Sequence, residues 1–285
     1  MTVSRAERLL RPLGLDRLLA TRTYRAARDP QWLMDPRAVR SRANLVDLHN
    51  AEAGASGVIV GTGRSLRETD LSAIGDRPTI GLNRLFYGFD ALDFRPDRLV
   101  CVNLMMLEQS APEIETAGVP VLASWGGRQY FSPDAEITYL RTFDGTRFSQ
   151  SLADRVYTGS TVTYVALQLA YWLGWHEVTL LGIDHSYRLE NHEQQLGPHA
   201  TSVRLEADQN HFMPDYFPAG QTWQLPDLEN SEAAYSQARR VFEANGRQVV
   251  DATVGGSLNV FNKAYWPRCN ANGAAMHAAP GTPAE

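Results

Sequence analysis

The chain has 285 residues, of which 44% are hydrophobic, and it carries a formal net charge of −5 at pH 7. This composition fits one large or two small globular domains and argues against bulk binding of nucleic acid. The two cysteines, Cys101 and Cys269, lie far apart and form no CxxC motif, which argues against a zinc knuckle or a disulfide scaffold. No apolar run is long enough to span a membrane, and the N-terminus holds no signal-peptide core, so we expect a cytoplasmic protein.

The two ends of the chain differ in character from its middle. Residues 1–52 are basic, since the first 50 hold ten arginines against five acidic residues, and the leucine pairs between the arginines predict a helical arm. This arm can pack on its own domain or on the partner subunit of a homo-oligomer; alternatively, it can make a peripheral contact with the inner face of an anionic membrane. Pro12 and Gly14 interrupt the helix and favour the first alternative. Residues 266–285 are mostly small or polar and are predicted to form a disordered tail.

Short apolar runs alternate with helical patterns between residues 53 and 265. The apolar runs predict strands at residues 57–60, 79–83, 98–103, 119–124, 176–184 and 247–253. The helical patterns begin at about Leu66 and then cover residues 104–118, 160–174 and 231–246. This alternation is typical of an α/β fold with an open, mostly parallel, Rossmann-like sheet that carries helices on both faces.

Residues 185–228 show no sustained period of either kind. A segment of this length is too long for a simple connection inside a compact domain, and such segments are usually active-site lids or binding loops. We therefore expect a lid-like segment that closes over a ligand, excludes water and becomes protected from proteases when the ligand binds. His211 lies inside this segment, between Asp208 and Asp215.

A glycine-containing turn follows the first predicted strand. Ligands of open α/β sheets bind beyond the carboxyl ends of the strands, and a helix N-terminus at that place attracts an anion. Gly61, Thr62 and Gly63 can therefore offer backbone N–H groups to a phosphate, while Ser65 can cap the following helix and donate its hydroxyl. The motif is neither GxGxxG, because Leu66 takes the third glycine position, nor a P-loop. A tight turn with a capping serine explains the same residues.

Further polar or small residues stand at the ends of other predicted strands or just before the helix at 160–174. They are Asn83, Asn103, Arg155, Thr158, Gly159, Ser160, Gly182, Asp184 and Tyr187. An asparagine amide can bind a ribose, a base or a sugar hydroxyl, and a helix N-terminus favours a negative charge. Each residue can also be an ordinary turn or cap residue, and the pattern leaves both interpretations open.

The histidines of the lid-like segment raise the question of a metal site. His185, His192 and His199 recur every seven residues, without the HxxxH or HExxH spacing of metal ligands, and the chain holds no DxD pair. We therefore predict no metal and no cofactor. His211 differs from the other three because acidic neighbours can orient its ring. It is a candidate general base, with a structural histidine in an aromatic-lined loop as the alternative.

These motifs, in this order, resemble those of the bacterial sialyltransferases of glycosyltransferase family 42 over residues 55–262. The matching stretches are GTGRSL at 61–66, NRLFY at 83–87, Val102-Asn103, Arg155 with Thr158-Gly159, LGID at 181–184, NHF at 210–212 and the stretch around Ser257 and Leu258. The chain departs from the family pattern at Arg64, where a proline or small residue is usual. It also departs at Ser186, where the first tyrosine of a phosphate-binding pair would align, with Tyr187 next to it. The same motifs also resemble the broader MptE-like group, whose namesakes are archaeal 6-hydroxymethylpterin diphosphokinases.

The resemblance implies a GT-A-like variant of the Rossmann-like fold, with a nucleotide-sugar-binding catalytic domain over residues 53–265. The implied reaction is a metal-independent, inverting transfer of sialic acid or another nonulosonate from a CMP-activated donor to a hydroxyl group of a glycan or lipid-linked glycan. In this reaction His211 is the base, while Tyr187, Tyr216 and Arg155 stabilise the leaving phosphate. The implied nucleotide-binding residues are Gly61, Thr62, Gly63, Ser65, Asn83, Asn103, Thr158, Gly159, Ser160, Gly182, Asp184 and Ser257. The alternatives are a glycosyltransferase that uses another nucleotide sugar and a pterin pyrophosphokinase, which would need Mg²⁺-ATP and clustered carboxylates.

Overall fold

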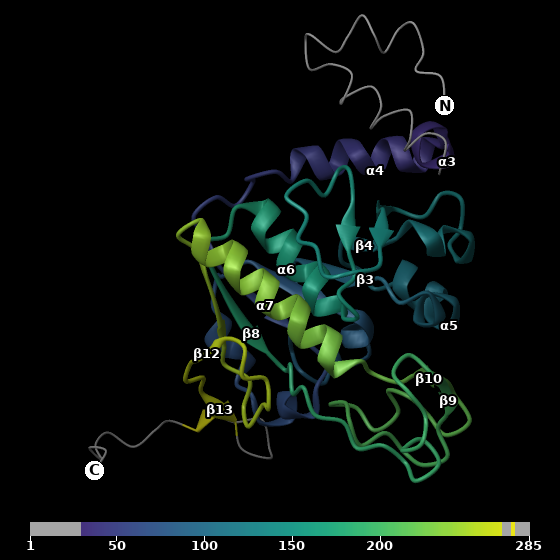
Figure 1. Ribbon diagram of the computed structural model, residues 1–285, viewed down its shortest axis with the longest axis vertical. Coiled ribbons are helices and arrows are strands. Elements are labelled where there is room, and N and C mark those ends of the chain that lie inside the picture. Colours follow the sequence, from purple (N-terminus) through teal and green to yellow (C-terminus); the bar gives the residue numbers. More distant parts are fainter. Residues whose placement is uncertain (1–29, 270–274, 277–285) are drawn as a thin grey trace, which may run out of the picture.

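The computed structural model describes residues 30–269 and 275–276; the first 29 residues of the basic arm and most of the predicted tail lie outside these ranges. Eight parallel strands form the central sheet, in the order β12-β11-β8-β1-β2-β3-β4-β5 (Figure 1). The strands are β1 (Ser56–Val60), β2 (Thr79–Leu82), β3 (Arg98–Cys101), β4 (Val121–Ser124), β5 (Ile137–Leu140), β8 (Glu177–Leu181), β11 (Gln248–Asp251) and β12 (Asn262–Lys263). The predicted α/β class with a parallel sheet is confirmed.

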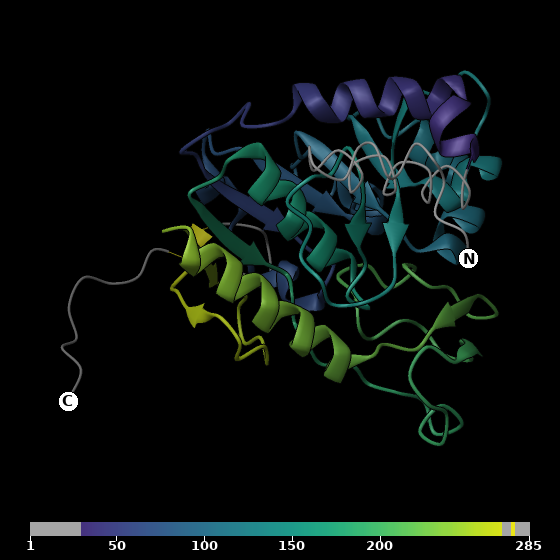
Figure 2. The same cartoon turned by 45° about the horizontal axis from the view of Figure 1, so that its top comes forward.

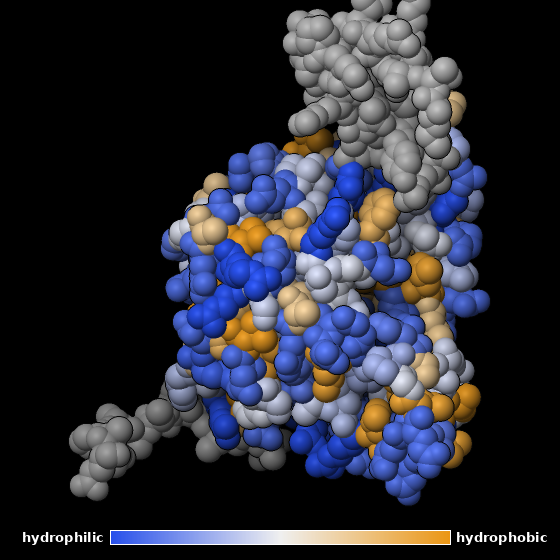
Figure 3. All heavy atoms as spheres, viewed as in Figure 1, coloured by the Kyte–Doolittle hydropathy of each residue, from blue (hydrophilic) through white to orange (hydrophobic). Residues whose placement is uncertain are grey.

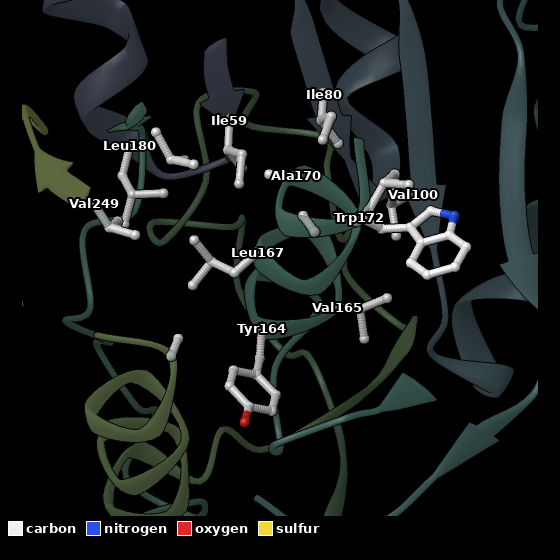
Figure 4. Packing of buried hydrophobic residues seen from close by; sticks show 14 of the residues in the cluster. Ile59, Ile80, Val100, Tyr164, Val165, Leu167, Ala170, Trp172, Leu180 and Val249 are labelled. Carbon is white, nitrogen blue, oxygen red and sulfur yellow. The ribbon is translucent and has the colours of Figure 1, made fainter. Parts of the chain in front are cut away.

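Helices cover both faces of this sheet. One face carries α6 (Val162–Leu173) and α7 (Leu228–Ala244), and Figure 4 shows Leu167 of α6 among Ile59, Leu180 and Val249 of three strands. The other face carries α5 (Leu104–Glu115) and four short 3-10 helices, η2 (Arg64–Glu68), η3 (Leu71–Ile74), η4 (Asn83–Gly88) and η5 (Trp125–Tyr130). The strands are apolar on both sides because both faces are covered.

The predicted helix from Leu66 is wrong in type. The chain forms η2 and η3 instead of one α-helix, because η2 ends at its C-cap Thr69 and the carboxylate of Asp70 accepts the N–H of Ser72 to cap η3 (3.0 Å). Ser65 lies inside η2 and is not its N-cap, a position that Gly63 occupies without a side-chain hydrogen bond. The helix predicted at 231–246 begins three residues earlier, at Leu228, because Asp227 caps it.

The described part of the basic arm packs on the edge of the sheet. It forms α3 (Pro30–Met34) and α4 (Pro36–Asp47), and the buried Leu45 and Ala38 face the domain core. Ser41 accepts the backbone N–H of Tyr139 in edge strand β5 (2.9 Å), so α4 covers groups that would otherwise stand open for pairing with another chain. No helix in residues 30–269 is long and apolar enough to cross a membrane.

The chain after β12 returns to the domain. Trp266 is buried, and its indole N–H donates to the backbone oxygen of Asp70 (2.8 Å). Arg268 pairs with Thr69, and β13 (Arg268–Cys269) pairs antiparallel with β14 (Ala275–Met276). The expected start of a disordered tail at residue 266 is therefore too early, because a buried tryptophan fixes this stretch to the core.

The lid-like segment 185–228 contains a short antiparallel pair, β9 (Thr201–Val203) and β10 (Thr222–Gln224), and lies beyond the carboxyl ends of the strands (Figures 1 and 2). A second small pair, β6 (Thr142–Phe143) with β7 (Val156–Tyr157), lies between β5 and α6 in the chain. In Figure 3 apolar residues gather at the lower right, where Figure 1 places β9 and β10. The lid-like segment 185–228 thus has a strand pair of its own and lies at the carboxyl ends of the central strands.

Candidate active site

A pocket of about 1210 Å³ lies at the carboxyl ends of the strands. It opens where the strand order reverses, because the chain leaves β1 toward β2 and later returns to β8 on the other side of β1. Twelve of the sixteen predicted site residues line it: Gly61, Thr62, Gly63, Asn83, Asn103, Thr158, Ser160, Gly182, Asp184, Tyr187, His211 and Tyr216. The other four, Ser65, Arg155, Gly159 and Ser257, are not among its lining residues.

His211 is held by a carboxylate, by an aromatic ring and by its own backbone. Its Nδ1 lies 2.6 Å from Asp208 Oδ2. Its ring stacks on that of Tyr216, with ring centroids 3.9 Å apart and an interplanar angle of 4°. Its backbone pairs antiparallel with Gly63, and the next N–H, that of Phe212, donates to the backbone oxygen of Thr62 (3.0 Å). The histidine is thereby fixed directly beside the glycine turn that follows β1.

The charge on Asp208 decides which nitrogen of His211 carries the proton. Burial alone would raise the pKa of Asp208, but the hydrogen bond and charge of His211 and the N–H of Asn210 hold it below its ordinary value. An ionised carboxylate can only accept, so a neutral His211 has its proton on Nδ1 and its lone pair on Nε2. No residue in the described part of the chain hydrogen-bonds Nε2. The pair therefore has the arrangement of a general base with its orienting acid.

We expect Asp208→Asn to change how stability depends on pH. Because the pKa of Asp208 is lowered in the folded protein, its contribution to the free energy of unfolding is complete above the ordinary value of 3.8 and is lost as the pH falls below it. Denaturant unfolding of both proteins should show the variant less stable above that value, with the gap narrowing below it. A gap that is equal on both sides would contradict the ionised pairing of Asp208.

The glycine turn is closed by the neighbouring strand end. The N–H groups of Gly61 and Gly63 donate to the backbone oxygens of Leu181 (2.8 Å) and Gly182 (2.9 Å), so they are not available to a phosphate. A Cβ on Gly61 would overlap the Gly182 oxygen, and one on Gly63 would overlap the Asp184 carboxylate. Glycine is therefore needed at both positions, because a side chain there would keep the ends of β1 and β8 apart.

Ser65 and Asp184 bind each other. The Ser65 hydroxyl donates to Asp184 Oδ1, and the Ser65 N–H donates to Asp184 Oδ2 (3.1 Å). The N–H of Ser257 donates to the backbone oxygen of Asp184 (2.8 Å). These residues fasten the turn after β8 to η2, which is the simpler role that the sequence left open for Asp184.

The two asparagines differ in what their side chains do. Asn103 caps α5, since its Oδ1 accepts the N–H of Met106 (3.1 Å). Its Nδ2 donates to Gln224 (3.0 Å) of the lid-like segment 185–228, which is called the lid from here on. Asn83 has a positive φ of 50°, and its buried Oδ1 has no hydrogen-bond partner among the described residues. A buried amide oxygen without a partner is costly, so Asn83 is prepared to accept a hydrogen bond from a ligand.

The turn before α6 places two of its three predicted residues in the pocket wall. Gly159 and Ser160 both have positive φ, 52° and 59°, and Thr161, rather than any of the three, caps the helix. The Ser160 hydroxyl lies 3.3 Å from His199 Nε2, and that nitrogen also lies 3.0 Å from Asp227, the N-cap of α7. The turn thus joins the lid to the first turns of both helices on this face.

Two of the three residues expected to stabilise a leaving phosphate, Tyr187 and Tyr216, line the pocket, and Arg155 does not. Tyr187 lines the pocket and is 40% exposed. The Tyr216 hydroxyl is buried against Thr62 and the N–H of Arg84, and burial raises the pKa of Tyr216 to about 12. Arg155 pairs with Asp154 outside the lining (3.4 Å), whereas Arg141, which the sequence analysis missed, lines the pocket. Tyr187 is therefore the best placed of the predicted phosphate-stabilising side chains.

A buried ionic core shapes the lid. Glu193 is fully buried and accepts the indole N–H of Trp223 (2.6 Å), and Arg204 pairs with Glu190 (3.3 Å) and Glu193 (3.6 Å). Burial alone would raise the pKa of Glu193, but hydrogen bonds from Trp223 and the backbone hold it below its ordinary value. The lid also closes on itself at its base, where the Asn210 amide accepts the N–H of Arg188 (2.7 Å) and donates to its carbonyl (3.0 Å).

The remaining lid histidines bind carboxylates or hydroxyls. His185 lies 3.0 Å from Glu232 of α7, and His192 lies 3.0 Å from the Ser202 hydroxyl. Within residues 30–269, no three His, Cys, Asp or Glu side chains come together in a way that could hold a metal ion. His185, like His199, fastens the lid to the helices beside it, whereas His192 binds within the lid.

No family model matches the chain, and no curated protein matches it. Among solved structures, the MAf glycosyltransferase from Magnetospirillum magneticum AMB-1 is 15% identical with a TM-score of 0.44, over 87% of this chain and 42% of that one. This chain therefore spans less than half the length of that protein. The sialyltransferase CstII from Campylobacter jejuni, in complex with the substrate analogue CMP-3FNeuAc, is 15% identical with a TM-score of 0.42, over 80% of this chain and 93% of that one. At this distance neither similarity assigns a function.

Proposed function

We propose that the protein is an inverting glycosyltransferase. It moves sialic acid or another nonulosonate from a CMP-activated donor to a hydroxyl group of a glycan or lipid-linked glycan, without a metal ion. The observation that carries the proposal is His211, which lies in the wall of a pocket at the switch point of a parallel sheet and is paired with the buried Asp208 behind that wall. The order of the motifs, which resembles family 42, supports the same reaction.

The size of the pocket suits a reaction between two substrates. Single-ligand pockets usually measure about 300–1,000 Å³, and this one measures about 1210 Å³. Asn83 supplies an unpartnered acceptor to the donor side, and Thr62 supplies the one N–H of residues 61–63 for which the described residues hold no acceptor. Phe143, which is partly exposed, adds aromatic surface on which a sugar ring can stack, whereas Trp125 and Trp223 line the pocket but are buried.

The chemistry asks for one proton transfer and one displacement. The acceptor oxygen attacks the anomeric carbon of the donor, and its proton passes to Nε2 of His211. The bond between the anomeric carbon and the phosphate oxygen breaks, and CMP leaves with the bonding electron pair, so the anomeric configuration inverts. Tyr187 and the Thr62 N–H then stabilise the charge on the phosphate. The folded lid limits the access of water, which is the competing acceptor.

A thermal-shift panel distinguishes the donor classes. We expect CMP to stabilise the protein without Mg²⁺, by about 2.7 kcal/mol when CMP is at 100 times its Kd. Stabilisation by UDP or GDP in place of CMP would indicate a glycosyltransferase with another donor, and a requirement for Mg²⁺-ATP would indicate a pyrophosphokinase. The absence of any shift would contradict nucleotide binding.

The homo-oligomer and a membrane contact through residues 1–29, which lie outside the described residues, stay predictions from the sequence.

A further inference from the structure

Arg84 of η4 is fully buried, and all of its side-chain hydrogen-bond partners are uncharged. Its Nε donates to Ser110 Oγ (3.0 Å), and one Nη donates to Gln109 Oε1 (2.7 Å), both on α5. The other Nη donates to the backbone oxygen of Tyr216 (2.8 Å) and to Gln221 Oε1 (3.2 Å), both in the lid. One guanidinium therefore joins three separate segments of the chain.

No acidic side chain of residues 30–269 pairs with Arg84, and a buried charge without such a partner needs a physical reason. Taking a guanidinium out of water costs several kcal/mol unless its N–H groups are satisfied. An apolar side chain would avoid this cost but would leave the Tyr216 oxygen and Gln221 Oε1 without their donor, while Gln109 Oε1 would keep only the Gln221 amide (3.2 Å). A lysine would keep the charge but lacks the planar fork that reaches acceptors in several directions. Only arginine meets both demands at this position.

The lid residues that Arg84 holds are those that hold His211. The N–H of Arg84 lies 3.4 Å from the Tyr216 hydroxyl, and the Tyr216 ring is the platform on which His211 stacks. The guanidinium lies 4.8 Å from the centre of the Phe217 ring, which meets the His211 ring edge-on at 5.4 Å. Arg84 therefore contacts both aromatic residues that pack on the His211 ring, Tyr216 and Phe217.

We infer that Arg84 is a positioning residue for the base. It fixes Tyr216 and Phe217 against η4 and α5, and so holds the His211 ring where it can take the proton of the acceptor hydroxyl. The inference rests on the proposed function for its catalytic consequence. Its structural half, the orientation of the His211 ring, holds whatever the substrate is.

The test is Arg84→Lys, measured in two independent ways. Misplacing a reacting group by about 1 Å can cost about 10²-fold in rate, so we expect kcat to fall by about that factor with little change in KM for the CMP-sugar. The second readout is proton NMR of the His211 imidazole, whose C–H signals are shifted upfield by the stacked Tyr216 ring. We expect the variant to lose most of this shift. The matched control is Arg95→Lys, an exposed arginine paired with Asp90 (2.7 Å), which should change neither readout.

The outcomes separate this inference from the proposed function. Wild-type kcat and unchanged His211 signals in Arg84→Lys would overturn the inference. If that variant does not fold, Gln221→Leu and Ser110→Ala each remove one partner while the arginine stays, and both should move the two readouts in the same direction by less. No change in either of them would equally overturn it. A wild-type protein that does not turn over CMP-sugars would overturn the proposed function, while the NMR signals would still decide the role of Arg84.

Discussion

Replacing His211 by alanine is expected to lower the rate of sugar transfer about 10²–10⁴-fold, which is the usual contribution of a general base. The reason is chemical, because the acceptor hydroxyl must lose its proton as it attacks, and Nε2 is the ring nitrogen that the described residues leave without a hydrogen bond. Binding of CMP should change little, since the turn after β1 and Asn83 stay in place. The measurement is the steady-state rate with a CMP-sugar and a glycan acceptor, together with a CMP titration.

A second variant separates the base from a structural role. His211→Ala leaves the buried Asp208 carboxylate without its ring partner, whereas His211→Asn can still donate to it. We expect His211→Asn to be more stable than His211→Ala but equally inactive. Added imidazole should restore part of the rate in the alanine variant. The control is His192→Ala, a 39% exposed lid histidine outside the pocket lining, which should keep its activity. Near-wild-type transfer by His211→Ala would show that the base lies elsewhere.

Replacing Glu193 by alanine is expected to open the lid. Removing one partner of a buried ion pair usually costs about 3–5 kcal/mol, because the remaining charge stays buried. Here the change leaves the Arg204 guanidinium with Glu190 alone and leaves the Trp223 N–H without its acceptor. Because the sheet and its helices do not depend on Glu193, the loss should fall on the lid, and transfer should fall with it.

Amide hydrogen exchange and limited proteolysis of the lid measure this effect. We expect faster exchange through β9 and β10 in Glu193→Ala, and unchanged exchange in β1 and β8. Glu206→Ala is the matched control, because Glu206 is an exposed acid in the same segment. The double variant Glu193→Leu with Arg204→Met should recover much of the protection, since an apolar pair can replace a buried ion pair. In the wild type, equal protease sensitivity with and without the CMP-sugar would count against a lid that closes on the donor.

The sequence predicts most of the sheet but not its edges. Strands such as β1 and β8 are continuous apolar runs, buried on both faces, so their composition identifies them. β5 was missed because its four residues follow a polar stretch, and β12 was missed because its two residues are exposed and polar. The change from one predicted helix to η2 and η3 depends on a single cap, that of Asp70, which periodicity does not register.

The site was predictable where the side chains act locally. His211 and Asp208 are three residues apart, so their pairing is within reach of a sequence argument. The use of the Gly61 and Gly63 N–H groups by the end of β8 depends on contacts across about 120 positions of the chain, which no local pattern contains. Arg84 shows the same limit: it stands in the NRLFY motif, and only the fold reveals that its partners come from α5 and the lid.

The clamp between Asn210 and Arg188 makes residues 189–209 a closed excursion, whose two ends meet through both hydrogen bonds of one amide. His211 stands just outside this excursion and is joined to Gly63 through its backbone. Asp208, which orients the His211 ring, lies near the end of this excursion, so it is residues 189–207 whose length and composition can change without altering the register between base and glycine turn. For protein engineering, the stretch before Asp208 is a cassette: a loop from another protein can be grafted between Arg188 and Asp208 to give the pocket a different rim while His211 keeps its orienting carboxylate.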